Sequence, residues 1–119
     1  MGIILFIVSI LLFIPLTLIN LTIVMVKHRT WRAFDGYFFQ TAIDIDRFGN
    51  RNFRTLFNAT LIEDWGYQFG DARETISSVL GKNQRDNSLT VLGEIVVFIL
   101  DKIDKDHCKK SIKELDNFN

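Results

Sequence analysis

Two pairs of nearby residues in this chain have side chains that could catalyse a reaction. Asp44 and Asp46 are carboxylates of the kind that bind metals or transfer protons, but no histidine or third acid lies near them in the sequence. Ser77 and Ser78 could supply a nucleophile, which requires an oriented base, and both histidines lie far away in the sequence. We therefore expect solvated or capping carboxylates at Asp44 and Asp46, and no catalysis at the serines.

His107 and Cys108 are adjacent and could suggest a metal ligand or a reactive thiolate. Two neighbouring ligands without companions at a suitable spacing are a weak indication of a metal site. Cys108 is the only cysteine, so the chain cannot form an internal disulfide, which agrees with a reducing compartment. We expect a packed cysteine here, and the sequence predicts no catalytic, cofactor-binding or metal-binding site and no small-molecule substrate.

Size and charge limit the classes of protein to which the chain can belong. Its 119 residues allow one modest soluble domain once a membrane segment is subtracted. Fourteen basic and fourteen acidic side chains give a net charge of zero, so the chain lacks the positive field that attracts nucleic acid. Eleven Phe, two Trp and two Tyr residues argue against disorder, because aromatic burial offsets the entropy cost of folding.

An uncharged apolar run at residues 3–26 predicts a membrane-spanning helix. Its twenty-four residues would cover about 36 Å as a helix, which exceeds the roughly 30 Å hydrocarbon layer of a bilayer. A cleavable signal peptide would need a basic leading segment, a shorter apolar core and a cleavage site with small residues. A buried helix of a soluble protein is the other alternative. Residues 1–26 are therefore predicted to be an anchor, kinked slightly at Pro15.

Residues 27–40 form a basic and aromatic segment next to the predicted membrane span. No charged residue precedes the span, and the bias of basic residues toward its C-terminal side predicts a cytoplasmic C-terminal domain, with the N-terminus on the other side of the membrane. The aromatic residues fit either an amphipathic helix on the bilayer surface or the core of the domain. The predicted membrane-interface residues are Lys27, Arg29, Trp31 and Arg32.

Three polar residues inside the predicted span fall on roughly one helical face: Ser9, Thr17 and Asn20. Polar groups in lipid are well satisfied by contact with a second helix, so this stripe is a candidate contact with a membrane-protein partner or a second copy. The alternative is that the two hydroxyls bond the backbone of their own helix while Asn20 reaches toward the interface.

Residues 41–119 are expected to form a small cytoplasmic helical domain. Apolar residues at helical spacing predict a helix at residues 52–62, and alternating aromatics and glycines predict an irregular loop at 63–70. Asp71 and Glu74 have the spacing of a capping box, and Gly81 supplies a stop signal, so we expect a helix at residues 72–80.

The last apolar run, which begins after Ser88 as a predicted N-cap, is apolar over most of its circumference. We therefore expect a deeply buried core helix at residues 89–100. A second membrane crossing is disfavoured because the run is short and contains Glu94, and a hairpin on the membrane surface is the other alternative. The tail from Asp101 to Asp116 is predicted to be a solvated helical face with i, i+4 ion pairs, interrupted near Asp106.

Two segments carry a resemblance to a known family: FGDARETISSVLGKN at residues 69–83 and IDKDHCKKSI at residues 103–112. With residues 45–50 and 56–62, they resemble a family of small uncharacterised proteins of tailed phages and prophages. The resemblance covers most of residues 43–112 and implies a phage or prophage origin in a bacterial host. No activity is attached to these motifs, so the resemblance does not decide between lysis, exclusion of competing phages and an accessory assembly role.

Taken together, the sequence predicts an all-α protein with one N-terminal transmembrane helix and a small helical domain. The favoured function is that of a membrane-anchored interaction or accessory protein that needs no cofactor. Its expected partners are the lipid bilayer and either a membrane protein or a second copy of the chain. The alternatives are a membrane-perturbing lysis or superinfection-exclusion protein and a subunit of a larger membrane complex, and an enzyme is the least favoured class.

Overall fold

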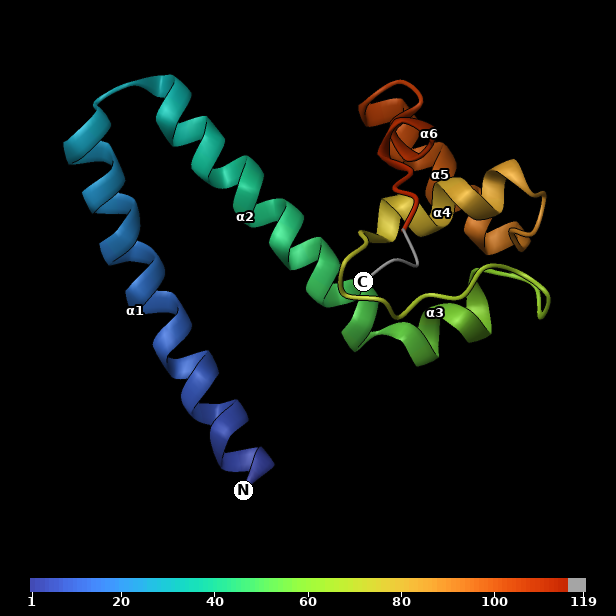
Figure 1. Cartoon of the computed structure of the whole chain (residues 1–119), viewed down its shortest axis with the longest axis horizontal. Coiled ribbons are helices and arrows are strands. Elements are labelled where there is room, and N and C mark those ends of the chain that lie inside the picture. The colour runs from blue at the N-terminus through green and yellow to red at the C-terminus, as the bar shows by residue number, and fades with distance from the viewer. Residues whose placement is uncertain (116–119) are drawn as a thin grey trace. The chain divides into compact units, whose positions relative to one another are not determined.

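The structure, a computed structural model, describes residues 1–115, so the predicted end of the tail at Asp116 lies outside the described residues. The described part is all-α, as the sequence predicts, with one isolated bridge between Ile62 and Leu89 (Figure 1). It contains the helices α1 (Gly2–His28), α2 (Trp31–Asn52), α3 (Arg54–Thr60), α4 (Ile76–Arg85), α5 (Val91–Ile103) and α6 (His107–Ser111). The chain divides into two compact units, the first ending at Ala42 and the second beginning at Ile43.

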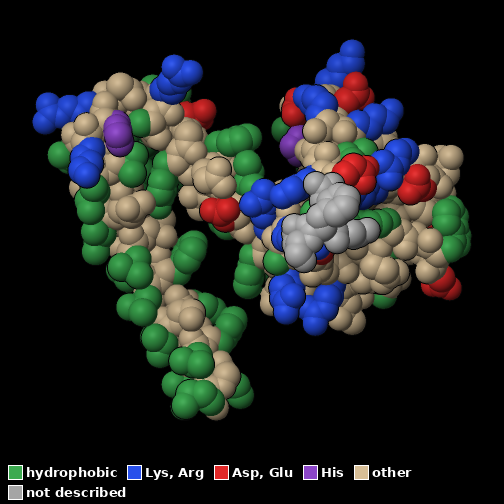
Figure 2. Space-filling model, in the orientation of Figure 1, with side chains coloured by type: hydrophobic (Ala, Val, Ile, Leu, Met, Phe, Trp, Pro, Cys, Tyr) green, Lys and Arg blue, Asp and Glu red, His purple; other side chains and the backbone are tan. Residues whose placement is uncertain are grey.

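Helix α1 is long and apolar enough to cross a membrane. None of its residues is buried, whereas the core helix of a soluble protein would be mostly buried (Figure 2). The helix continues through Pro15 and ends where Arg29 adopts the left-handed conformation, with φ 49°, and donates its N–H to the carbonyl of Met25. Within the first unit, the exposure of α1 is unlike that of a soluble core helix.

Helix α2 begins with the hydroxyl of Thr30, which accepts a hydrogen bond from the N–H of Ala33. The rings of Trp31, Phe34 and Phe38 follow one another along one face, with centroids 5.2 Å and 4.8 Å apart. Trp31 is 76% exposed, and Phe38 is exposed as well. Trp31 and Phe38 are therefore exposed within the first unit, and both alternatives for the aromatic residues stay predictions.

The core of the second unit forms around α4, against which α5 and α6 pack. All residues of α4 from Ser77 to Asn83 are buried, and they include polar side chains as well as Val79 and Leu80. Gly81 lies so close to α6 that a Cβ would overlap the carbonyl oxygen of Cys108. The other core residues are Leu61, Ile62, Phe69, Val97 and Cys108.

The predicted limits of α4 are wrong at both ends. The helix starts at Ile76 rather than at residue 72, and its N-cap is Thr75, whose hydroxyl accepts the N–H of Ser78 at 3.1 Å. Asp71 instead stabilises the preceding turn by accepting the N–H of Arg73 at 2.9 Å. Gly81 does not stop the helix, because its missing side chain serves close packing and leaves the helical backbone intact.

The prediction of a deeply buried helix at 89–100 is also wrong. Of the residues in α5, only Gly93 and Val97 are buried. The N-cap is Thr90, whose hydroxyl accepts the N–H of Gly93, whereas Ser88 is a buried residue that bonds Asn83. Helix α5 therefore packs with one face only.

The tail is interrupted at Asp106, as the sequence predicts, because this residue adopts the left-handed conformation, with φ 56°. The expected i, i+4 pairs are replaced by other pairs. Lys110 bonds Asp104 at 2.8 Å, and Glu114 bonds Arg85 at 2.9 Å. The second pair links the tail to α4.

The N-cap of α4 generates a direct test. Replacing Thr75 by Ala should destabilise the domain by about 1 kcal/mol, because the N–H of Ser78 loses its acceptor. Urea unfolding of the full chain in detergent micelles, followed by circular dichroism, measures this change. Thr55→Ala is the matched control, since Thr55 is an exposed residue inside α3, and it should leave the stability nearly unchanged. Equal effects of the two substitutions would contradict this capping.

Candidate functional site

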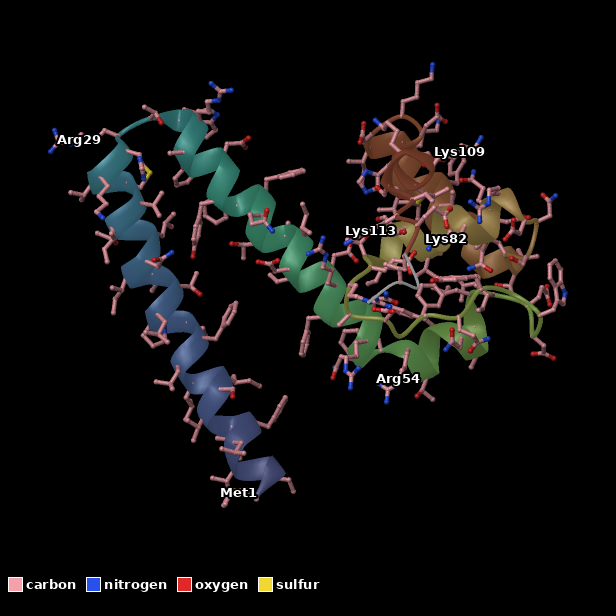
Figure 3. The ribbon with its side chains drawn as sticks, in the orientation of Figure 1. Met1, Arg29, Arg54, Lys82, Lys109 and Lys113 are labelled. Atoms are coloured by element: carbon pink, nitrogen blue, oxygen red, sulfur yellow. The ribbon has the colours of Figure 1, made fainter. Side chains whose placement is uncertain are left out.

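The predicted membrane-interface residues lie at the junction of α1 and α2. Lys27, Arg29, Trp31 and Arg32 are all exposed there, and Figure 3 labels Arg29 at the turn between the two helices. Basic side chains therefore gather at the end of the apolar helix, which is the arrangement expected where such a helix leaves a bilayer.

Of the predicted intramembrane contact residues, two bond their own helix. The hydroxyl of Ser9 donates to the carbonyl of Leu5 at 2.7 Å, and that of Thr17 donates to the carbonyl of Phe13 at 2.6 Å. Asn20 is exposed. The hydroxyl groups are thus satisfied without a second helix, and contact with a membrane partner through this stripe stays a prediction.

The outer face of α5 in the second unit exposes several large apolar side chains. Val91 is 75% exposed, Phe98 is 62% exposed and Ile103 is 79% exposed. The exposed large apolar residues of this helix are Val91, Leu92, Ile95, Phe98, Ile99 and Ile103, which we call the α5 face. A stripe of large apolar residues in water is uncommon on a monomeric soluble domain and is typical of an interaction surface.

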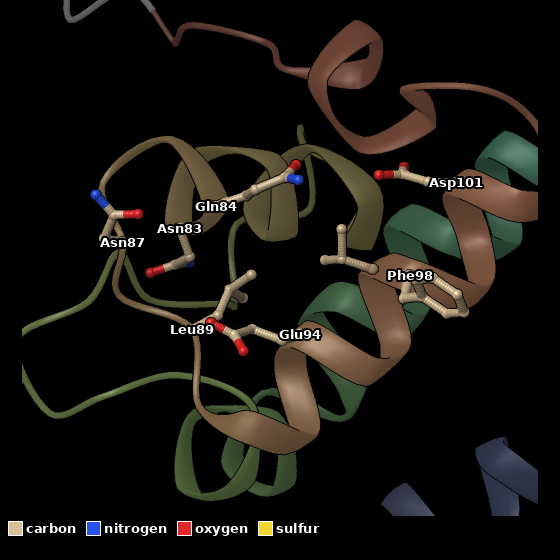
Figure 4. Close-up of a pocket in the computed structure, with 8 residues that line it drawn as sticks. Asn83, Gln84, Asn87, Leu89, Glu94, Phe98 and Asp101 are labelled. Atoms are coloured by element: carbon tan, nitrogen blue, oxygen red, sulfur yellow. The ribbon is translucent and has the colours of Figure 1, made fainter.

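A shallow groove of about 320 Å³ runs beside the α5 face, between α4 and α5 (Figure 4). Asn83 and Gln84 of α4 line one side, while Glu94, Phe98 and Asp101 of α5 line the other. Phe98 belongs to both the groove and the α5 face, so the two features form one continuous surface with an acidic edge.

Two asparagines hold the loop that precedes α4. Asn58 accepts the N–H of Phe69 at 2.7 Å and donates to its carbonyl at 3.2 Å. Asn83 does the same for Tyr67, with both distances 2.9 Å. A side-chain amide that bonds both backbone groups of one residue replaces a strand partner. The loop therefore has a defined conformation without a β-sheet.

A third asparagine, Asn50 of α2, is fully buried beneath the turn before α4. Its Nδ2 donates to the carbonyls of Asp71 and Glu74 at 2.9 Å and 2.8 Å, and its Oδ1 accepts the N–H of Gly70. Gly70 has φ 138°, a conformation that favours glycine. This asparagine thereby links the end of α2 to the start of α4.

A buried ion pair joins the turn before α4 to the helix itself. The Lys82 ammonium lies 2.7 Å from a carboxylate oxygen of Glu74, and both residues are almost completely buried. The hydroxyls of Ser78 and Tyr67 donate to the same carboxylate at 2.5 Å and 2.9 Å. Burial alone would lower the pKa of Lys82, but the hydrogen bonds to Glu74 and Tyr67 outweigh it and raise that pKa.

The structure brings together side chains that the sequence leaves far apart. His107 lies with Nε2 3.1 Å from the hydroxyl of Ser77 and Nδ1 3.1 Å from the carboxylate of Asp104, which is the connectivity of a serine nucleophile with its base. Ser77 is only 5% exposed, however, and the nearby N–H of Ile76 already donates to the carboxylate of Asp46. A negative group at that position would repel the oxyanion of an acyl-transfer reaction. The arrangement therefore acts as a tie between α4 and α6.

Asp44 and Asp46 of α2 have different environments. Asp46 is partly buried, and this burial raises the pKa of its carboxyl despite the N–H of Ile76. Its contact with the start of α4 agrees with the expected capping role. Asp44 is exposed. Among residues 1–115, no group of three or more His, Cys, Asp or Glu side chains could hold a metal ion.

In comparisons with known proteins, no protein-family model matches this chain, and no curated protein or solved structure matches it significantly. The geometry described above is therefore the basis for any proposal about function.

Cys108 is fully buried against α4, which confirms the expected packed cysteine. Burial raises the pKa of its thiol to about 12, and the negative charges of Asp101 and Asp46 add to this effect. The thiol is therefore protonated and inert at neutral pH.

The buried ion pair generates a prediction about stability. Lys82→Met should destabilise the domain by about 3 kcal/mol, because it leaves the Glu74 carboxylate buried without its cation. The double variant Glu74→Gln with Lys82→Met should recover part of this loss. Urea unfolding of the full chain in micelles measures both changes, and Lys109→Met, at an exposed position, is the control. A double variant no more stable than Lys82→Met would contradict a coupled pair.

Cys108 generates a prediction about reactivity. Iodoacetamide should label the folded chain at least about a hundred-fold more slowly than a Lys109→Cys, Cys108→Ala variant, in which the only thiol is exposed. Because the pKa of Cys108 is about 12, its labelling rate should not reach a plateau between pH 7 and pH 10, whereas the exposed thiol should approach one. Rapid labelling of the folded protein at pH 7 would disprove this burial.

Proposed function

We propose that this chain is a single-pass, membrane-anchored interaction protein. Helix α1 holds it in the bilayer, and the helical domain presents the α5 face to a partner. The exposure of six large apolar side chains on α5 is the observation that carries this proposal, because burying them against a partner would release the water that they now order.

The proposed location is the inner membrane of a bacterium, with the N-terminus outside and the helical domain in the cytoplasm. The basic residues that follow α1, including Lys27 and Arg29, support this orientation through the positive-inside rule. The phage or prophage origin is proposed from the resemblance of residues 69–83 and 103–112 alone.

We assign no catalytic role to the contact between Ser77 and His107. Two features support this choice: Ser77 is almost completely buried, and Asp46 already occupies the backbone donor beside it. Catalysis by a serine needs an accessible hydroxyl and free donors for the developing negative charge.

Fractionation of bacterial cells that express the full chain at low level tests the anchor. The protein should stay in the membrane pellet after extraction with alkaline carbonate and should dissolve only in detergent. A Leu12→Arg, Leu16→Arg variant should lose this behaviour, because each arginine near the centre of a span costs about 2.5–3.5 kcal/mol. The matched variant Leu12→Ala, Leu16→Ala should behave like the wild type.

Protease treatment of intact spheroplasts tests the orientation in the same cells. A C-terminal tag should be protected until the membrane is broken. Release of the wild type by carbonate, cleavage of α1 during export, or digestion of the tag in intact spheroplasts would each contradict the proposed anchor or its orientation.

A further inference from the structure

The α5 face has the residue spacing of a helix-pairing surface. Val91, Ile95 and Phe98 follow one another at intervals of four and three residues, so they form one stripe along the helix. Lys102 continues the same stripe, and its ammonium lies 5.2 Å from the centre of the Phe98 ring. Over its 13 residues, nearly two heptads, α5 therefore presents a seam that ends in a positive charge.

One edge of this seam is acidic. Glu94 and Asp101 are seven residues apart, which places both carboxylates on the side of the stripe that borders the groove (Figure 4). Among residues 1–115, no hydrogen bond or ion pair involves the Glu94 carboxylate, and one oxygen of Asp101 accepts only the N–H of Cys108 at 3.4 Å. In paired helices, the charges of the residues that flank the seam determine which partner helix binds.

This charge pattern disfavours a second copy of the chain as the occupant. In an antiparallel pair of α5 helices, Glu94 of each copy would face Asp101 of the other. In a parallel pair, the two copies of Lys102 would meet in the seam. Like charges at such positions are destabilising, so either arrangement works against self-pairing.

The same pattern disfavours the bilayer surface. Between residues 91 and 106 there are four acidic residues and two lysines, so the segment carries net negative charge. Helices that lie on membranes usually carry basic residues beside their apolar face, because bacterial and other cytoplasmic leaflets contain anionic lipids. A partner with basic flanks would gain attraction where a membrane would meet repulsion.

We propose that the α5 face pairs with an apolar helix of another protein that carries Lys or Arg beside its own apolar stripe. The stripe of Val91, Ile95 and Phe98 supplies the apolar contact, and Glu94 and Asp101 select the basic flank. This inference rests on the proposed function, since it names the chemistry of the partner that the anchored domain binds.

The probes that test this inference are two synthetic helical peptides with the same leucine seam. One peptide carries lysines at the flanking positions and the other carries glutamates. The full chain is placed in nanodiscs of neutral phosphatidylcholine, and binding is measured by fluorescence anisotropy. The lysine peptide should bind about ten-fold more tightly than the glutamate peptide, because two attractive charge pairs replace two repulsive ones.

Three variants separate the charge effect from the apolar contact. Glu94→Lys with Asp101→Lys should invert the preference in favour of the glutamate peptide, an outcome that loss of folding cannot produce. Glu63→Lys with Asp64→Lys makes the same charge change at exposed loop positions and should leave the preference unchanged. Ile95→Ser with Phe98→Ser should abolish binding of both peptides to the full chain.

Several results would overturn the inference. They are the absence of binding by either peptide, equal binding of both, and a preference that survives the Glu94 and Asp101 reversals. Dimerisation of the wild type through α5 would identify a second copy as the occupant. A polarity-sensitive dye attached to an Ile99→Cys variant reports on the bilayer in the absence of peptide. If the dye enters an apolar environment when anionic phosphatidylglycerol replaces phosphatidylcholine, the α5 face binds the bilayer.

The peptide-binding result is independent of the membrane-fractionation result. If carbonate releases the chain from membranes but the chain still binds the lysine peptide selectively, the proposed anchor is wrong and the proposed partner surface is supported. If the chain resists carbonate extraction but binds neither peptide, the proposed anchor is supported and the proposed partner is wrong.

Discussion

The second unit depends on one constraint: its central helix, α4, is both buried and polar. Each polar group along Ser77–Asn83 must find a partner inside the protein, because an unpaired buried group costs about 1–3 kcal/mol. The Glu74–Lys82 ion pair and the clamp of Asn83 on Tyr67 meet this requirement. The same bonds fix the loop before α4, so the polar interior determines the fold as much as the apolar contacts do.

The open face of α5 follows from this arrangement. Because α4 occupies the centre, α5 packs on the core through Gly93, Val96, Val97 and Leu100, and its other side is exposed in the described part of the chain. Close approach at Gly93, where a Cβ would overlap the carbonyl of Leu61, fixes which side faces inward. The apolar stripe with its acidic edge is therefore held on a rigid element. Rigid presentation lowers the entropy cost of binding and suits a surface for a protein partner.

The sequence predicts some parts of this molecule well because their signals are local. The apolar run of α1 and the break at Asp106 depend on neighbouring residues alone, and the burial of Cys108 follows the general preference of free cysteine for protein interiors. The predicted limits of α4 were wrong because Asp71 and Thr75 are both good capping residues, and only tertiary contacts decide between them. The prediction that α5 is deeply buried was wrong because periodicity shows that a face is apolar without showing what covers it. The tie of Ser77 to His107 joins residues thirty positions apart, beyond any local pattern.

The central claim is that the α5 face is covered by another protein in the native membrane. Photocrosslinking in living host cells, with a photoreactive phenylalanine at position 98 or at the exposed loop position 63, tests it most directly. The account predicts a crosslink from position 98 to one membrane-associated protein, competed by the lysine-flanked peptide in isolated membranes, and none from position 63. Crosslinks from position 98 only to lipid or to a second copy of the chain, or equal crosslinks from both positions, would contradict it.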